Sequence, residues 1–422
     1  MATQTEQQES FHYQLRLLLE EVCCELCRFE HVNHDGCPPE SVQIDREFNL
    51  GVPNVFADIR VAPASGPPYF VEVKFGYSKD LLLRHLRRKY GPESPAAAWG
   101  SKIILVSGSD GSLDRQSLAA DLSRSLDPRL GLEVWDERLL LAKIRECFRA
   151  DYQTITTEHL LDLREAIDRA KGYYAFSGTS FEEYKNDPLR AQLLWHFGFW
   201  RLRQLRESGR PTPRDILPPG NYRGVAVVLA DLCSFSSFVR DTPDSEIVRE
   251  CLTSFYSKTR YQIINNGGML YQFVGDEVIG FFGLPEAEEG FVARALDTAK
   301  AVLSIGESVS HHWQRRIDRV QNLGGVHVGM AIGDLQIVSL RPFSRTHVGA
   351  IGDCINVAAR LMATASQGEI AVSNSYHLLL PEETQGEFQE VEPIEARNVG
   401  RIKAWKFRSG AGGRSRQEEK GG

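Results

Sequence analysis

RGVAVVLADLCSFSSF (Arg223–Phe238) opens a new folding unit in the second half of the 422-residue chain. Its first part, Val225–Ala230, is a short and nearly unbroken apolar run, which is typical of a buried β-strand. The run leads directly into Asp231, so a carboxylate stands at the end of that strand. The proline-rich stretch 211–220 lies just upstream and predicts a boundary, because proline stops helices and stiffens linkers.

A second carboxylate follows in a predicted hairpin. Two apolar runs, 267–274 and 277–283, flank Gly275-Asp276, which is a tight-turn signal. If these strands and the first one are neighbours in one sheet, Asp231 and Asp276 lie side by side. Two such carboxylates repel one another unless a cation neutralises them, and Mg²⁺ prefers oxygen ligands of this kind. The alternative is that Asp231 caps a helix and Asp276 is an ordinary turn residue.

A later segment, GDCINVAARL (Gly352–Leu361), predicts a helix that carries two polar side chains on one face. Asn356 and Arg360 are four residues apart, so they point the same way. An amide and a guanidinium together suit a sugar and a negatively charged phosphoryl group. The alternative is a solvated helix face.

Four segments together carry a family resemblance. VVLADLCSFSSF, MLYQFVGDEVIGFFG, VHVGMAIGDLQIV and VGAIGDCINVAARLMATA resemble the class III adenylate and guanylate cyclase catalytic domain, in its order and at about its spacing. The resemblance covers nearly all of residues 222–408. It implies an α+β domain over 221–408 with a βαββαβ core, which is a ferredoxin-like sheet with flanking helices. It also implies the closure of a nucleoside triphosphate into a 3′,5′-cyclic nucleotide.

The resemblance implies a metal site as well. Asp231 and Asp276 match the family's two metal aspartates, with the main chain of Leu232 beside them, and two Mn²⁺ or Mg²⁺ ions are implied per site. The main chain at Phe235 and Ser236 leads into a helix, where free amides favour triphosphate oxygens.

Further positions match residues that contact the substrate. Asn356 and Arg360 match the pair that orients the ribose and stabilises the transition state from the opposite subunit, so a homodimer is implied. The family's basic residue for the triphosphate precedes a glycine near the C-terminus, where this chain has Val399. Arg397 or Arg401 is the expected substitute.

The positions that select the base depart from both purine patterns. The family uses Lys with Asp or Thr for adenine, and Glu with Cys for guanine, whereas this chain has Gln272 and Gly349. Gln272 can donate and accept hydrogen bonds and so can match uracil or cytosine. The changed positions resemble the pyrimidine cyclases of bacterial Pycsar antiphage systems. Tyr271 is a second candidate that narrows the pocket, but strand alternation predicts that it faces away from Gln272.

The N-terminal part carries another constellation. Asp58 and Glu72-x-Lys74 lie on two alternating strands joined by a Pro/Gly turn, and hairpin pairing brings them together. This resembles the D…ExK arrangement of the restriction-endonuclease-like α/β fold, which implies metal-dependent DNA cleavage or a sensor derived from it. A basic cluster follows at 84–89, and an early helix with Glu20 or Glu21 completes the expected arrangement.

The cysteines allow two interpretations. Cys24, Cys27, His31, His34 and Cys37 include zinc-ligand spacing. However, cysteines three and four residues apart in a helical run also mark a buried face, which is the favoured interpretation.

Bulk properties bound the rest. The net charge of −7 argues against wholesale nucleic-acid binding, and the sequence shows neither a signal peptide nor an apolar run near ~20 residues. We therefore expect a cytoplasmic protein with no membrane contact. The expected divisions are 1–150 (nuclease-like domain), 151–220 (helical connector and linker), 221–408 (cyclase domain) and 409–422 (disordered tail).

The leading hypothesis is a uridylate cyclase that makes cyclic UMP from UTP for a separate cyclic-nucleotide-binding effector in antiphage defence. The alternatives are a cytidylate cyclase, an adenylate cyclase with a relaxed base pocket, a nuclease run by the N-terminal domain, and a catalytically silent nucleotide-binding module. Nucleic acid is an expected partner only of the N-terminal domain.

Overall fold

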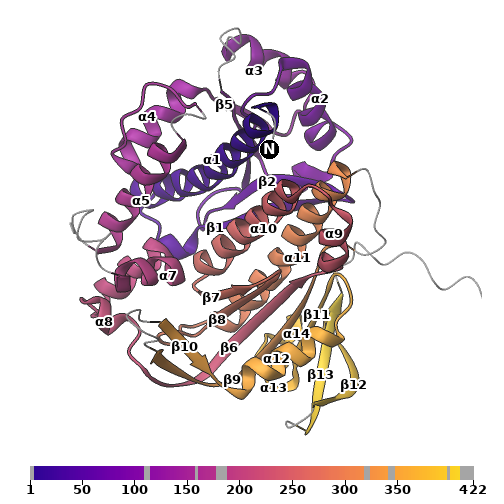
Figure 1. The fold of residues 1–422 in the computed structure, drawn as a ribbon. Coiled ribbons are helices and arrows are strands. Elements are labelled where there is room, and N and C mark those ends of the chain that lie inside the picture. The colour runs from indigo at the N-terminus through magenta and orange to yellow at the C-terminus, as the bar shows by residue number, and fades with distance from the viewer. Residues whose placement is uncertain are drawn as a thin grey trace, which may run out of the picture. The chain divides into compact units, whose positions relative to one another are not determined.

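The computed structural model describes residues 4–108, 115–156, 160–176, 188–317, 324–340, 347–396 and 400–408. It contains two compact units, Met1–Tyr184 and Lys185–Gly422 (Figure 1). The segment predicted as a connector contributes a helix to each: α5 (Leu160–Phe176) belongs to the first unit and α7 (Pro188–Glu207) to the second. Among the described helices, none is both long and apolar enough to cross a membrane.

The first unit is built on a five-stranded sheet in the order β1-β2-β3-β4-β5. The strands β1, β2 and β3 form an antiparallel meander, whereas β3, β4 and β5 are parallel. The elements are α1 (Gln4–His34), η1 (Pro39–Ser41), β1 (Gln43–Val52), β2 (Val55–Ala62), β3 (Tyr69–Val73), α2 (Lys79–Tyr90), η2 (Pro95–Ala98), β4 (Lys102–Val106), α3 (Arg115–Ser123), β5 (Gly131–Trp135) and α4 (Glu137–Phe148).

The cysteines of α1 are core residues. Cys23, Cys24 and Cys27 are fully buried free thiols, and burial raises the pKa of each. Within the described residues no group of three or more His, Cys, Asp or Glu side chains is placed to hold a metal ion. The buried-face interpretation therefore describes these residues, and nothing supports zinc.

The second unit contains an eight-stranded sheet in the order β12-β13-β11-β9-β6-β8-β7, with β10 paired to β9. Its elements are α8 (Pro213–Ile216), β6 (Gly220–Leu232), α9 (Phe235–Asp241), α10 (Ser245–Asn265), β7 (Met269–Val274), β8 (Glu277–Phe282), α11 (Phe291–Arg316), β9 (Val326–Leu340), β10 (His347–Ile351), α12 (Asp353–Thr364), β11 (Glu369–Ser373), α13 (Asn374–His377), α14 (Glu382–Gln385), β12 (Gln389–Ala396) and β13 (Gly400–Arg408).

The centre of this sheet has the predicted connectivity. The strands β6, β7, β8 and β9, with α9 and α10 after β6 and α11 after β8, form the βαββαβ unit. Their order in the sheet is β9-β6-β8-β7, and all three pairings are antiparallel. This is the ferredoxin-like arrangement, so the α+β prediction for this domain is confirmed.

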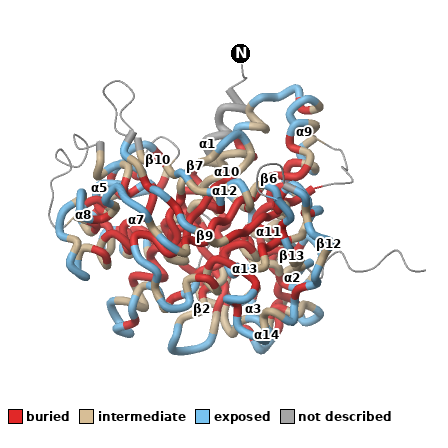
Figure 2. Tube along the Cα trace, turned by 90° about the horizontal axis from the view of Figure 1, so that it is seen from below, coloured by how far each residue is buried: buried red, intermediate tan, exposed pale blue. Residues whose placement is uncertain are grey.

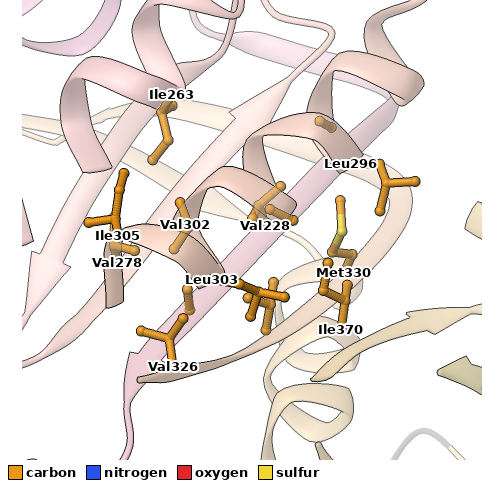
Figure 3. Close-up of a cluster of buried hydrophobic side chains, with 14 of the residues drawn as sticks. Val228, Ile263, Val278, Leu296, Val302, Leu303, Ile305, Val326, Met330 and Ile370 are labelled. Atoms are coloured by element: carbon orange, nitrogen blue, oxygen red, sulfur yellow. The ribbon is translucent and has the colours of Figure 1, made fainter. Parts of the chain in front are cut away.

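One face of the sheet packs on α10 and α11. Val228, Val278 and Met330 point from the strands toward Ile263 of α10 and Leu303 of α11 (Figure 3). Buried residues continue along β6, β9 and α11 (Figure 2). Each buried side chain of this size contributes roughly 1.5–3 kcal/mol, so this layer fixes the positions of the strand ends.

The other face of the sheet is partly covered by α12. Gly329 of β9 lies between core residues Val328 and Met330, so it faces away from α10 and α11. A Cβ at Gly329 would lie 2.1 Å from the Ala358 carbonyl oxygen and 2.4 Å from the Met362 nitrogen. Only glycine allows α12 to lie this close to the strand.

Candidate active site

The structure brings the two predicted metal aspartates together. Asp231 lies opposite Glu277 on β8, and Asp276 precedes Glu277 in the β7–β8 turn. The neighbours of Asp231 in the strand, Ala230 and Leu232, belong to the core cluster, so Asp231 points to the opposite face of the sheet. The hairpin and strand-end predictions for this pair agree with the geometry.

The electrostatics of this pair are unbalanced. Burial and the adjacent Asp231 carboxylate raise the pKa of Asp276 to about 6. Burial and Asp231 also raise the pKa of Glu277. No lysine or arginine in the described part of the chain forms an ion pair with Asp231 or Asp276. The pair therefore has the charge and the oxygen ligands that suit a divalent cation.

A histidine that the sequence analysis did not single out also lies here. His327 of β9 is directly opposite Asp231, and its Nε2 is 3.4 Å from Asp231 Oδ2. The signal was present in the sequence, because His327 is a polar side chain in the apolar run VHVGM. His327 could not be assigned to the site from the sequence, because only the register of β6 and β9 places it opposite Asp231.

The segment after Asp231 presents main chain rather than side chains. The side chains of Leu232 and Phe235 are buried, and the Phe235 ring packs 5.8 Å from that of Phe238. Ser236 is exposed in the first turn of α9, directly after Phe235. Leu232 and Phe235 therefore have only main-chain atoms to offer a metal or a triphosphate.

The helix α12 presents the predicted polar face. Asn356 and Arg360 are both exposed, whereas Cys354, Ala358 and Leu361 are buried. Neither the Asn356 side chain nor the Arg360 side chain makes a hydrogen bond or an ion pair with another described residue. The structure does not connect them to Asp231 or Asp276 within one chain.

The strand β7 contains a β-bulge at the predicted base-reading position. Leu270 lies opposite Gly280 and Gln272 lies opposite Ile279, so Tyr271 is an extra residue with no partner on β8. A bulge of this kind breaks the simple alternation of side chains along the strand.

The bulge places two candidate side chains on one face. The Tyr271 ring packs against Phe281, with 5.0 Å between ring centroids. Phe281 and Ile279 are two residues apart on β8 and share a face, and Gln272 is the partner of Ile279. Tyr271 and Gln272 therefore lie on the same face, which is also that of Asp231. The expectation that Tyr271 faces away from Gln272 is wrong, because it assumed an unbroken strand.

The second predicted base position lies next to Tyr271. Gly349 is buried in β10 and pairs with Val338 of β9. The following amide, Ala350 N–H, donates a hydrogen bond to the Tyr271 hydroxyl at 3.2 Å. The structure thus brings β7 and β10 together at Tyr271 and Gly349.

The two candidate triphosphate arginines differ. Arg397 lies outside the described residues. Arg401 is exposed at the start of β13 and lines a pocket of about 500 Å³ with Asp334 of β9 and Asp353 of α12. Asp334 is seven residues along β9 from His327, roughly 20 Å at the usual rise per residue. Arg401 therefore lies beside α12 rather than beside Asp231 of its own chain.

The predicted second site in the first unit is also assembled. Lys74 Nζ forms ion pairs with Asp58 and with Glu72, the latter at 2.8 Å. A further lysine enters from α2: Lys89 Nζ lies 2.7 Å from Glu72 Oε2 and 3.3 Å from Asp58 Oδ1. The Tyr90 hydroxyl donates to Glu72 Oε1 at 2.6 Å. These are two carboxylates and two ammonium groups.

This second cluster does not fit a nuclease metal. Lys74 and Lys89 hold the pKa of Asp58 well below its usual range, and the two carboxylates of the cluster face two ammonium groups. Lys89 contacts both carboxylates, as a bridging cation would. The early-helix glutamates are also engaged elsewhere: Glu20 with Arg46 at 2.6 Å, and Glu21 with Lys171. We derive no cleavage step from this cluster.

Comparison with known proteins points to one family. Residues 217–409 match the family described as "Adenylate and Guanylate cyclase catalytic domain". Uncharacterized protein Rv1320c of Mycobacterium tuberculosis is 27% identical over 146 residues, 35% of this chain and 24% of that protein. Uncharacterized protein Rv1319c of the same organism is 24% identical over 174 residues, 41% and 29% respectively. The matched part thus spans less than a third of these curated relatives.

Solved structures that the comparison matches to this chain include the guanylyl cyclase Cya2, 18% identical with a TM-score of 0.39, covering 46% of this chain and 98% of that one. They also include the adenylyl cyclase CyaB from P. aeruginosa, 18% identical with a TM-score of 0.38, covering 48% and 99%. The segment matched by the family contains the βαββαβ core, Asp231, Asp276, Asn356 and Arg360. The segment 217–409, a little under half of the chain, therefore matches the adenylate and guanylate cyclase catalytic domain.

Proposed function

We propose that this domain converts UTP to 3′,5′-cyclic UMP and pyrophosphate. The observation that carries the proposal is the carboxylate pair Asp231 and Asp276, which no lysine or arginine among the described residues neutralises, with Asp231 on the same sheet face as Tyr271 and Gln272. A cyclase needs a divalent-cation site and a base-reading site on surfaces that meet. The coarser activity, nucleotide cyclisation, follows from the family, and the uracil preference is the proposed refinement.

The residues of this chain have separate roles in the proposed reaction. Asp231 and Asp276 would hold two Mn²⁺ or Mg²⁺ ions, which when bound lower the pKa of the ribose 3′-hydroxyl and neutralise triphosphate charge. Asn356 orients the ribose, and Arg360 donates to the α-phosphoryl oxygens as negative charge develops. The 3′-oxygen attacks the α-phosphorus in line, and pyrophosphate leaves.

The triphosphate needs a further basic group, and Arg401 is the described candidate. It lines the pocket that includes Asp353 at the start of α12, the helix of Asn356 and Arg360. Arg401, Asn356 and Arg360 would therefore be supplied to a site by the same chain. Arg397 remains the other candidate from the sequence.

The base preference rests on three residues. Gln272 has an amide that donates and accepts, which complements the hydrogen-bonding edge of uracil or cytosine. The Tyr271 ring lies beside Gln272 and takes up space that a purine would need. Gly349 offers no side chain that could read adenine or guanine. A site without the matching polar groups discriminates against purines strongly.

Incubation of the purified chain with Mn²⁺ and each of the four nucleoside triphosphates tests the proposal, with products identified by mass spectrometry. Cyclic UMP should form fastest. Cyclic AMP alone would support the relaxed adenylate cyclase, and cyclic CMP in excess would support the cytidylate cyclase. No cyclic product from any nucleotide would overturn the proposal.

We further propose that the active form is a homodimer. Asn356 and Arg360 are exposed and make no contact with Asp231 or Asp276 in the described chain. A second copy can supply them, and each dimer then has two equivalent sites. Mixing equal amounts of Asp276→Asn and Arg360→Ala chains should restore about a quarter of wild-type activity, because half the dimers are mixed and each has one intact site. Independent sites within each chain would give no recovery.

The biological role follows from the resemblance of the base positions to Pycsar pyrimidine cyclases. We propose that cyclic UMP acts as an alarm for a separate cyclic-nucleotide-binding effector during phage infection. A plaque assay with the gene and its neighbours tests this, and Asp231→Asn should abolish protection. If Lys74→Ala abolished protection while Asp231→Asn did not, the N-terminal unit would be the acting part.

A further inference from the structure

The bulge in β7 has a partner outside the strands. Leu270, the residue before the bulge, is buried in the core, and its carbonyl oxygen lies 2.6 Å from Nδ1 of His196. A carbonyl oxygen can only accept, so Nδ1 carries the proton and donates. His196 is buried too and belongs to α7, the first described helix of the second unit.

The helix α7 is broken at Gly198, and the carbonyl groups freed by this break bind α10 next to β7. Gly198 is non-helical, with φ 71° and ψ 168°, and a Cβ there would lie 2.8 Å from Ile264 of α10. A break at this point frees carbonyl groups one turn earlier. Arg260 of α10 donates to two of these, the carbonyls of Leu194 and Trp195, at 2.9 Å and 3.1 Å.

The same turn of α7 contacts β7 a second time. The Trp195 ring lies 6.2 Å from that of Phe273, two residues beyond the bulge, and Phe273 stacks on Tyr256 of α10. His196 and Trp195 therefore contact β7 on both sides of Tyr271. On the core side, the bulge is contacted by His196 of α7. On the other side, the Ala350 amide donates to the Tyr271 hydroxyl.

We propose that His196 is a positioning residue for base recognition, which fixes the β7 bulge and thereby keeps Tyr271 and Gln272 on one face. The proposal rests on the proposed function, because it assigns a role to α7 in that site. His196 does not touch the nucleotide. Its hydrogen bond holds the Leu270 carbonyl, so the chain leaves the strand path at Tyr271 and returns to it at Gln272.

Two conservative variants separate the hydrogen bond from the side chain's bulk. In His196→Asn the amide nitrogen takes nearly the place of Nδ1, whereas in His196→Gln it lies one bond further out. We expect His196→Gln to reduce the preference for UTP over ATP in kcat/KM about tenfold, the effect of one lost buried hydrogen bond. The change should lie in KM, with kcat within about twofold. His196→Asn should keep the wild-type preference.

Amide hydrogen exchange of the segment 269–274 gives a readout that does not depend on catalysis. Exchange should be faster in His196→Gln than in His196→Asn, with Arg203→Ala, a change at a half-exposed side chain of α7, as a control. Equal exchange and equal base preference in folded Asn and Gln variants would overturn the proposal. If wild type prefers another base, the proposed function fails, while the Asn and Gln comparison still decides the role of His196.

Discussion

The chain contains two carboxylate pairs that look alike in the sequence and differ in the structure. Asp58 and Glu72 are surrounded by Lys74, Lys89 and Tyr90, so their charge is balanced within the protein. Among the described residues no lysine or arginine pairs with Asp231 or Asp276, and the nearest basic side chain is His327, 3.4 Å from Asp231. Pairs of this kind are therefore distinguished by their neighbours and not by their motifs.

The difference assigns different roles. A balanced buried cluster holds its elements in place, and losing one member leaves an unpaired buried charge. An unbalanced pair is costly on its own and gains free energy when a divalent cation binds. The first cluster therefore joins β2, β3 and α2, whereas the second awaits a cation and a substrate.

The largest expected effect comes from removing the unbalanced pair. Asp276→Asn should lower cyclase activity by about a thousandfold, since the cation ligand and its charge are lost. The exposed carboxylate variant Glu289→Gln should retain full activity. Initial rates with Mn²⁺ and UTP provide the measurement, and comparable rates for the two variants would remove Asp276 from the site.

Substitutions in the cluster of Asp58, Glu72, Lys74 and Lys89 should lower the stability of the fold. Lys89→Met leaves Glu72 fully buried beside a single lysine, which should lower the free energy of unfolding by about 3 kcal/mol. Lys102→Met is the matched control, because Lys102 and Glu133 are 3.0 Å apart but their side chains are 41% and 38% exposed. That pair should be worth less than about 1 kcal/mol. Urea denaturation measures both, and equal losses would contradict the assigned difference.

The pH dependence of stability should have opposite signs in the two regions. The pKa of Asp58 is lowered by folding, so its contribution is present above the unfolded pKa, about 3.9, and is lost as pH falls further. The pKa of Asp276 is raised to about 6, so in metal-free protein its contribution declines as pH rises from about 4 to 6. Melting curves in EDTA should show this decline in wild type and not in Asp276→Asn.

The smallest expected effect concerns metal binding to the first unit. Mn²⁺ should leave the unfolding transition of that unit unchanged in wild type, since Lys89 contacts both carboxylates. In Lys89→Ala, Mn²⁺ should raise the melting temperature of the first unit by a few degrees, because an ion that binds the folded state and not the unfolded state stabilises the fold. A wild-type shift of the same size would mean that the cation displaces Lys89.

The sequence predicted the features that depend on local pattern. Asp231 and Asp276 were placed by apolar runs and a Gly-Asp turn, and Asn356 and Arg360 by helical spacing. What it missed depends on contacts between elements. The bulge at Tyr271 could not be predicted from the sequence, because the segment MLYQFV has the composition of an ordinary strand. Only the pairing of β7 with β8 shows that Tyr271 is an extra residue.

The same limit explains Lys89 and His327. Lys89 stood in the sequence as one member of a basic cluster, and only the packing of α2 on β3 shows that it neutralises Glu72. His327 became part of the site through its register opposite Asp231. Phe235 was expected to offer its main chain to the triphosphate, and the burial of its ring in the core is compatible with that prediction.

Counting bound Mn²⁺ in the presence of 3′-deoxy-UTP, which cannot cyclise, tests the central contrast most directly. Equilibrium dialysis should find about two ions per chain in wild type. Both should be lost or weakened in Asp231→Asn and unaffected in Asp58→Asn. Ions that depend on Asp58, or a wild-type count that survives Asp231→Asn, would contradict the account.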